Sequence, residues 1–107
     1  MDKLIKDGMV AVLYSPGFGA GWSTWSDGEN AEAMVFDPEL AEATLAGGPG
    51  MLDKMTAIAK AKWPDEYLGG LDDLTVKWVP VGAKFYIDEY DGHESVVLMD
   101  DVQFRTA

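Results

Sequence analysis

The spacing of apolar residues changes at Trp63-Pro64, and this change constrains the fold more than any other feature of the sequence. Before that point, apolar side chains recur at helical intervals in Met51, Leu52, Met55, Ile58 and Ala59. After it, they alternate with polar residues, as in the segment Leu74-Thr75-Val76-Lys77-Trp78. An amphipathic helix followed by half-buried strands predicts an α+β fold.

Start and stop signals indicate a first strand and two further helices. The apolar and partly β-branched run 9–14 predicts a buried strand, which Pro16-Gly17 ends. Residues 30–36 suit a short helix. Asp37-Pro38 begins the next helix, because Asp37 can cap it and Pro38 suits its first position. The run Gly47-Gly48-Pro49-Gly50 ends that helix, and Trp63-Pro64 ends the long one that follows.

Alternation also predicts strands over residues 85–90 and 95–99, with Asp91-Gly92 as the turn signal between them. If His93 and Glu94 belong to the loop, it has four residues rather than two. A short strand over 102–104 is expected to follow Asp100-Asp101. Together these elements predict one domain over residues 1–107. Its mostly antiparallel sheet has about four strands, with two or three helices on one face.

Composition excludes several classes of protein. The chain has 19 acidic and 8 basic side chains, a net charge of −11 and no cysteine, so it is no disulfide scaffold and has no cysteine-ligated metal. Its charge disfavours direct binding to a phosphate backbone. His93 is the single histidine, which rules out a multi-histidine metal site. We expect no catalytic constellation, no metal site and no cofactor. The sequence has no long apolar run, so we expect a cytosolic protein without a membrane-spanning segment.

The segment 15–26 holds the strongest candidate for a binding site. Its glycines let successive amides bend around an anion, its aromatic rings offer faces for stacking a base, and its hydroxyls add donors. The candidate ligand-binding residues there are Phe18, Gly19, Gly21, Trp22, Ser23, Thr24 and Trp25. The spacing matches neither a Walker A loop nor a dinucleotide fingerprint. The alternative is a glycine-rich corner whose tryptophans fill a small core.

A second glycine-rich segment follows at Tyr67-Leu68-Gly69-Gly70. Tyr67, Gly69 and Gly70 could close against the first loop as part of the same site, or they could form a plain connection between a helix and a strand. The many carboxylates beyond it, Glu94 among them, are expected to form a solvated acidic face.

Six blocks of the sequence are distinctive: Ser15-Pro-Gly-Phe-Gly-Ala-Gly-Trp-Ser-Thr-Trp25, Phe36-Asp-Pro-Glu39, Gly69-Gly-Leu-Asp-Asp73, Lys77-Trp-Val-Pro-Val-Gly82, Phe85-Tyr-Ile-Asp-Glu-Tyr-Asp-Gly92 and Glu94-Ser95. In these blocks the chain resembles a family of small acidic proteins encoded by bacteriophages and prophages. The resemblance covers nearly the whole chain. It implies an accessory protein in the host bacterial cytosol that acts against host defence.

Three hypotheses follow for the function. The first is a non-catalytic protein that sequesters a nucleotide-derived signal in the 15–26 loop. The second is an acidic interaction protein that imitates nucleic acid and blocks a basic host defence protein. The third is a small hydrolase of a nucleotide signal. A homo-oligomer is also possible, because the run 96–99 would place apolar residues on both faces of a strand.

Overall fold

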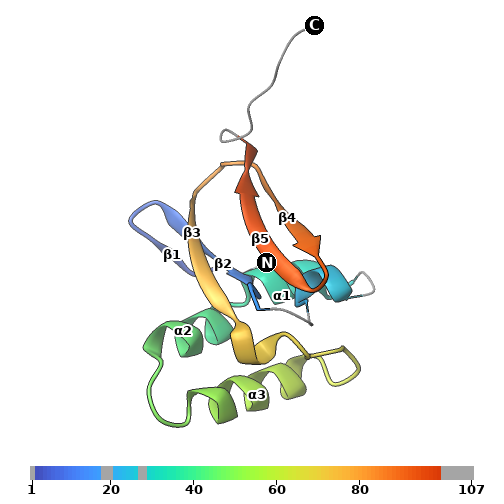
Figure 1. Cartoon of the computed structure of the whole chain (residues 1–107). Helices are drawn as coiled ribbons and strands as arrows, with labels where there is room; N and C mark the ends of the chain where they lie inside the picture. Colours follow the sequence, from blue (N-terminus) through green and yellow to red (C-terminus); the bar gives the residue numbers. More distant parts are fainter. Residues whose placement is uncertain (1, 18–20, 27–28, 100–107) are drawn as a thin grey trace, which may run out of the picture.

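The structure is a computed structural model that describes residues 2–17, 21–26 and 29–99 (Figure 1). Its helices are α1 (Ala31–Phe36), α2 (Pro38–Ala46) and α3 (Met51–Lys62), with single 3-10 turns η1 (Ser23–Trp25) and η2 (Leu71–Asp73). Its strands are β1 (Ile5–Lys6), β2 (Met9–Tyr14), β3 (Thr75–Pro80), β4 (Phe85–Tyr90) and β5 (His93–Leu98). The α+β prediction is confirmed. The strand expected over 102–104 lies outside the described residues.

The strands pair antiparallel and divide between two sheets, instead of forming the one sheet that we expected. The first sheet has the order β1-β2-β3, and the second is the β4–β5 hairpin. Beyond β3 the chain turns out of the first sheet, because the Ala83 amide donates to the Pro80 carbonyl (3.0 Å). The Val81 amide donates to the Gly8 carbonyl (2.9 Å). β4 therefore starts in a new direction and pairs with β5.

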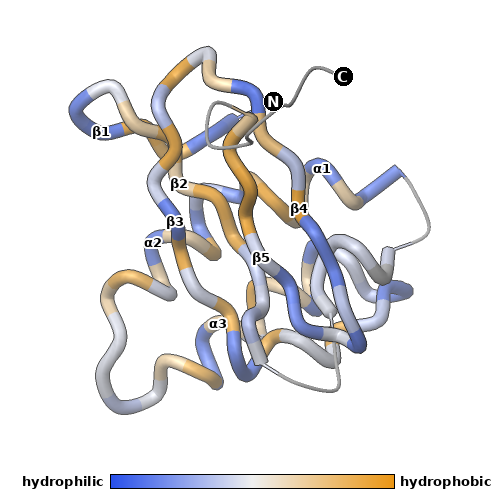
Figure 2. The backbone as a smooth tube through the Cα atoms, turned by 45° about the horizontal axis from the view of Figure 1, so that its top comes forward, coloured by the Kyte–Doolittle hydropathy of each residue, from blue (hydrophilic) through white to orange (hydrophobic). Residues whose placement is uncertain are grey.

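Strand β2 is the centre of the fold because both of its faces are buried. Ala11 and Leu13, on one face, pack in a core with residues of the helices. Val12, on the other face, packs in a second core with Val79 and with Val96 of the hairpin. Successive side chains of a strand point to opposite faces, so α2 and α3 cover one face of β2 and the hairpin covers the other. Helix α1 contributes to both cores, with Met34 in the first and Val35 in the second. In Figure 2, β2 is largely apolar between these two layers.

Two Asp-Gly dipeptides form the tight turns of the hairpins. Asp7 and Gly8 have φ values of 52° and 76°, and Asp91 and Gly92 have 54° and 85°. Positive φ at both central positions is the geometry of a two-residue hairpin turn. The strand predicted from residue 95 therefore begins at His93, so His93 and Glu94 belong to β5 rather than to a loop. Strand β1 was not predicted, although Asp7-Gly8 is the same signal.

Helix α2 begins as the sequence predicted. The Leu40 amide donates to the Asp37 carboxylate (2.9 Å), and Pro38 takes the first helical position. Helix α3 ends at Lys62, and the Trp63 amide donates to the Ala59 carbonyl (2.8 Å). In the described part of the chain, no helix is long and apolar enough to cross a membrane.

Candidate functional site

A buried carboxylate organises the glycine-rich and tryptophan-rich loop. Glu94, the second residue of β5, has a side chain with no exposed surface. Its Oε1 accepts from the Ser15 amide (2.8 Å), and its Oε2 accepts from the amides of Trp22 (2.9 Å) and Thr24 (3.1 Å). The Thr24 hydroxyl also donates to Oε2. Glu94, which we expected on a solvated acidic face, is thus the internal anion of this loop.

The position of Glu94 follows from the pairing of the hairpin. With a two-residue turn, Glu94 falls on the same face of β5 as Val96, which is buried in the second core. Its amide points away from β4 and donates to the Ser15 carbonyl (2.8 Å). The backbone and the side chain of Glu94 therefore both attach the hairpin to the end of β2.

The loop and the carboxylate depend on each other. A buried carboxylate is costly unless it accepts enough hydrogen bonds, and buried amides are costly unless they find an acceptor. The expectation that this loop can bind an anion was based on the outward amides of glycine-rich backbone. The amides of Ser15, Trp22 and Thr24 do surround an anion, and that anion belongs to the chain itself.

Trp22 lies in the core with the helices. Its side chain has no exposed surface, and its indole Nε1 donates to the Met34 carbonyl (2.7 Å). Its ring meets that of Trp63 edge to face, with centroids 6.0 Å apart. Stacking on a ligand requires an exposed indole face, and Trp22 has none in this structure. Trp22 therefore fills the core, which is the alternative to a stacking role that the sequence left open.

The other residues predicted for the loop differ in their surroundings. Gly21 and Ser23 are buried, and Thr24 is exposed while its amide and hydroxyl donate to Glu94. Phe18 and Gly19 lie outside the described residues, as does the side chain of Trp25. The described donors of Ser15, Trp22 and Thr24 are therefore turned inward, toward Glu94.

The second glycine-rich segment packs against the first. A Cβ added at Gly70 would collide with the carbonyl oxygen of Gly21, and one added at Gly17 would collide with the Asp73 side chain. These glycines are therefore needed for close approach of the two segments. Tyr67 lies beside Gly69 and is 53% exposed.

Glu66, which was not predicted to contribute, also ties the two segments together. It accepts hydrogen bonds from the Ser26 hydroxyl (2.7 Å) and the Asn30 side-chain amide (3.2 Å). The segment after α3 is thus attached to the far end of the loop as well.

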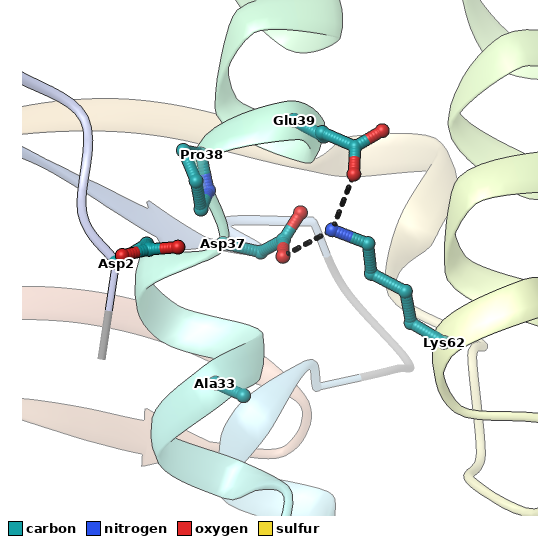
Figure 3. Close-up of a pocket in the computed structure, with 6 residues that line it drawn as sticks. All are labelled: Asp2, Ala33, Asp37, Pro38, Glu39 and Lys62. Atoms are coloured by element: carbon teal, nitrogen blue, oxygen red, sulfur yellow. Dashed lines mark hydrogen bonds and ion pairs between the residues drawn. The ribbon is translucent and has the colours of Figure 1, made fainter.

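A cavity of about 390 Å³ lies elsewhere, beside the start of α2 (Figure 3). It is lined by Asp2, Ala33, Asp37, Pro38, Glu39 and Lys62, none of which was predicted as a site residue. The Lys62 ammonium bridges the carboxylates of Asp37 (2.7 Å) and Glu39 (2.9 Å). Three carboxylates around one engaged lysine do not suit a phosphate group.

The ion pairs change the titration of Lys62. Partial burial lowers its pKa, but the hydrogen bonds and charges of Asp37 and Glu39 outweigh this and raise the pKa above 10.5. Asp37 therefore acts twice, as the cap of α2 and as the anchor for the end of α3.

Comparisons of the chain with protein-family models, with curated proteins and with solved structures gave no match. Within the described residues, no group of three or more histidine, aspartate or glutamate side chains could hold a metal ion. The assignment of a site therefore depends on the geometry of the chain. That geometry gives the 15–26 loop a buried carboxylate as its centre.

We predict that Glu94→Gln destabilises the protein by at least about 2 kcal/mol, since the new amide group would present donors to amides that need an acceptor. Urea denaturation measures this loss. The matched control is Asp88→Asn, an exposed carboxylate of the neighbouring strand, which should change stability by less than about 0.5 kcal/mol. Equal stability of Glu94→Gln and the wild type would contradict this role for Glu94.

Trp22→Phe should lower the free energy of unfolding by about 1–3 kcal/mol, because it removes the hydrogen bond to Met34 and leaves part of the core unfilled. Chemical denaturation again gives the value. Exposed aromatic residues that serve a ligand contribute little to stability, so a neutral Trp22→Phe substitution would argue for the stacking hypothesis instead.

Lys62→Met should cost about 1 kcal/mol at neutral pH. A raised pKa in the folded state stabilises the protein fully below 10.5, and this contribution disappears as pH rises through the folded-state pKa. The difference between wild type and variant should therefore shrink in the alkaline range, measured by urea denaturation across pH. Lys60→Met, an exposed lysine in the same helical turn, is the control. A difference that grows with alkaline pH would contradict the ion pairs.

Proposed function

We propose that the protein is a non-catalytic interaction protein that binds a basic partner through its acidic surface and competes there with nucleic acid. The observation behind this proposal is that Glu94 accepts hydrogen bonds from the amides of Ser15, Trp22 and Thr24, so these donors of the best ligand-binding candidate are turned inward. The chemistry that the described surface offers to a partner is then mainly that of carboxylates.

The distribution of charge supports this proposal. Exposed carboxylates occur on the turns, on all three helices and on the hairpin: Asp2, Asp7, Glu29, Glu32, Glu39, Glu42, Asp53, Asp65, Asp72, Asp73, Asp88 and Asp91. With a net charge of −11, they produce a negative field that attracts basic surfaces and accelerates their association. Part of the basic charge of α3 is neutralised, because Lys62 is paired with Asp37 and Glu39.

Sequestration of a nucleotide-derived signal is less well supported. It would need an exposed aromatic face and free donors, whereas Trp22 is buried and three amides of the loop bind Glu94. The cavity beside α2 has carboxylates where a phosphate would need donors. The hydrolase hypothesis gains no support from Glu94, the buried carboxylate beside the loop, because both of its oxygens accept hydrogen bonds from backbone amides.

The resemblance to phage-encoded proteins suggests where the partner belongs. We place it among the basic, nucleic-acid-binding proteins of a bacterial host, including its defence effectors, encountered in the cytosol. An acidic protein that covers a basic groove excludes nucleic acid without performing chemistry. This mechanism needs neither a cofactor nor a metal.

Capture from a bacterial lysate on immobilised protein tests the proposal. The captured proteins should be basic, and both added salt and added duplex DNA should release them, because charges at the interface are screened and DNA occupies the same groove. The control is a variant with four exposed carboxylates replaced, Glu32→Gln, Glu42→Gln, Asp53→Asn and Asp65→Asn, which should capture less. Capture that is indifferent to salt and to DNA would refute the proposal.

Calorimetry with cyclic dinucleotides and cyclic ADP-ribose isomers completes this test. We expect no heat of binding from the folded protein. Binding of any of these ligands would instead favour the sequestration hypothesis. The folded state must be verified in the same sample, by its cooperative unfolding transition.

A further inference from the structure

The outer face of the β4–β5 hairpin combines aromatic rings with negative charge. Phe85 and Ile87 point inward and pack against the second core. The alternate residues Tyr86, Asp88 and Tyr90 point outward, with Tyr86 47% and Tyr90 79% exposed. Tyrosines are enriched at protein interfaces, where a large ring adds contact area at low entropic cost. The exposure of two such rings on one strand indicates a surface for a partner.

The spacing on this face fits an arginine side chain. Outward residues of a strand follow one another at about 6.6 Å, so Asp88 lies between Tyr86 and Tyr90 along the outer face of β4. A guanidinium group can donate two parallel hydrogen bonds, one to each oxygen of a carboxylate. It can also lie over a tyrosine ring within about 6 Å. A lysine ammonium is a compact and strongly hydrated charge, and it gains less from this combination.

The charge of the face is concentrated near the turn. Asp88 and the exposed Asp91 lie toward that end, while the exposed Lys84 precedes the strand at the other. Across the hairpin, Asp88 pairs with Ser95 and Tyr90 pairs with His93. An arginine of the partner is therefore expected between Asp88 and Tyr90.

The hairpin is held in place before any partner arrives. The rings of Phe85 and Phe36 meet edge to face, with centroids 6.0 Å apart. The Lys77 ammonium donates to the Val96 carbonyl (3.5 Å), and Glu94 attaches β5 to the loop. A surface that is already ordered loses little conformational entropy on binding.

Charge also decides between possible occupants. In a symmetric dimer the same patch meets itself, so the Asp88 carboxylates of both copies would enter one interface. Like charges placed opposite each other are destabilising, and each copy carries a net charge of −11. Nucleic acid is repelled in the same way. A positively charged segment with arginine is the occupant that complements this face.

We propose that the outer face of the β4–β5 hairpin, formed by Tyr86, Asp88 and Tyr90, docks an arginine-containing segment of the basic partner. This inference rests on the proposed function, because it names the surface through which the acidic protein recognises that partner. Long-range attraction then comes from the whole acidic surface, and selection of arginine comes from this face.

Fluorescence anisotropy with two labelled peptides of equal charge tests the docking face. One peptide alternates arginine with serine, and the other alternates lysine with serine. The arginine peptide should bind more tightly at low salt. Asp88→Asn should weaken its binding about fivefold or more. Asp53→Asn, an equal loss of charge on the exposed face of α3, should weaken it less than about twofold.

The rings are tested by Tyr86→Thr and Tyr90→Thr, since threonine keeps the preference for a strand and removes the ring. Each should weaken binding of the arginine peptide about two- to fivefold, with less effect on the lysine peptide. Thermal unfolding of every variant verifies the fold. If a threonine variant unfolds, Tyr86→Val or Tyr90→Val replaces it at that position. The valine variant must weaken binding of the arginine peptide by the same factor.

The outcomes separate this inference from the proposed function. If Asp88→Asn and Asp53→Asn weaken binding equally, or if the two peptides bind equally, the docking face is refuted while diffuse acidic binding stands. If neither peptide binds wild-type protein and no lysate protein is released by salt and DNA, both proposals are refuted. If only the hairpin variants lose affinity, and only for the arginine peptide, the result supports the docking face.

Discussion

A carboxylate buried without exposed surface requires a complete set of donors, and Glu94 obtains its donors from residues far away in the sequence. The Ser15 amide that donates to it is 79 residues away, and the Trp22 amide is 72 residues away. These hydrogen bonds join the second sheet to the end of the first and define the path of the chain after β2. Because each partner is costly to bury without the other, the loop and the hairpin stabilise one another.

This constraint explains why the 15–26 loop resembles a binding site. Backbone that surrounds an anion needs glycines, closely spaced amides and nearby hydroxyls, whether the anion is a ligand or a side chain. The glycines also permit close packing, since Gly21 lies directly against Gly70. Trp22 is buried beneath the loop and closes the core on its inner side. The same residue types therefore serve the interior of the fold.

Local signals made most of the fold predictable, and they missed what depends on distant contacts. Strand β2, the Asp37 cap and helix α3 follow from patterns within a few residues. The burial of Glu94 depends on a choice between a two-residue and a four-residue turn, which moves it between a loop and the buried face of β5. The signals for its burial were the two-residue turn at Asp91-Gly92 and the period of two along the strand, which places Glu94 on the same face as Val96. Composition alone cannot separate a core tryptophan from a stacking one, so Trp22 needed the structure.

Among the described acidic residues, the buried ones and the exposed ones have opposite energetic consequences. Asp37 and Glu94 are buried, and both receive hydrogen bonds, so they stabilise the fold through specific partners. The exposed carboxylates repel one another, and this repulsion destabilises the compact state. A basic partner bound to the surface relieves the repulsion, and anything that binds only the folded protein raises its stability. On our proposal, the charge that weakens the isolated chain is therefore the same charge that favours its complex.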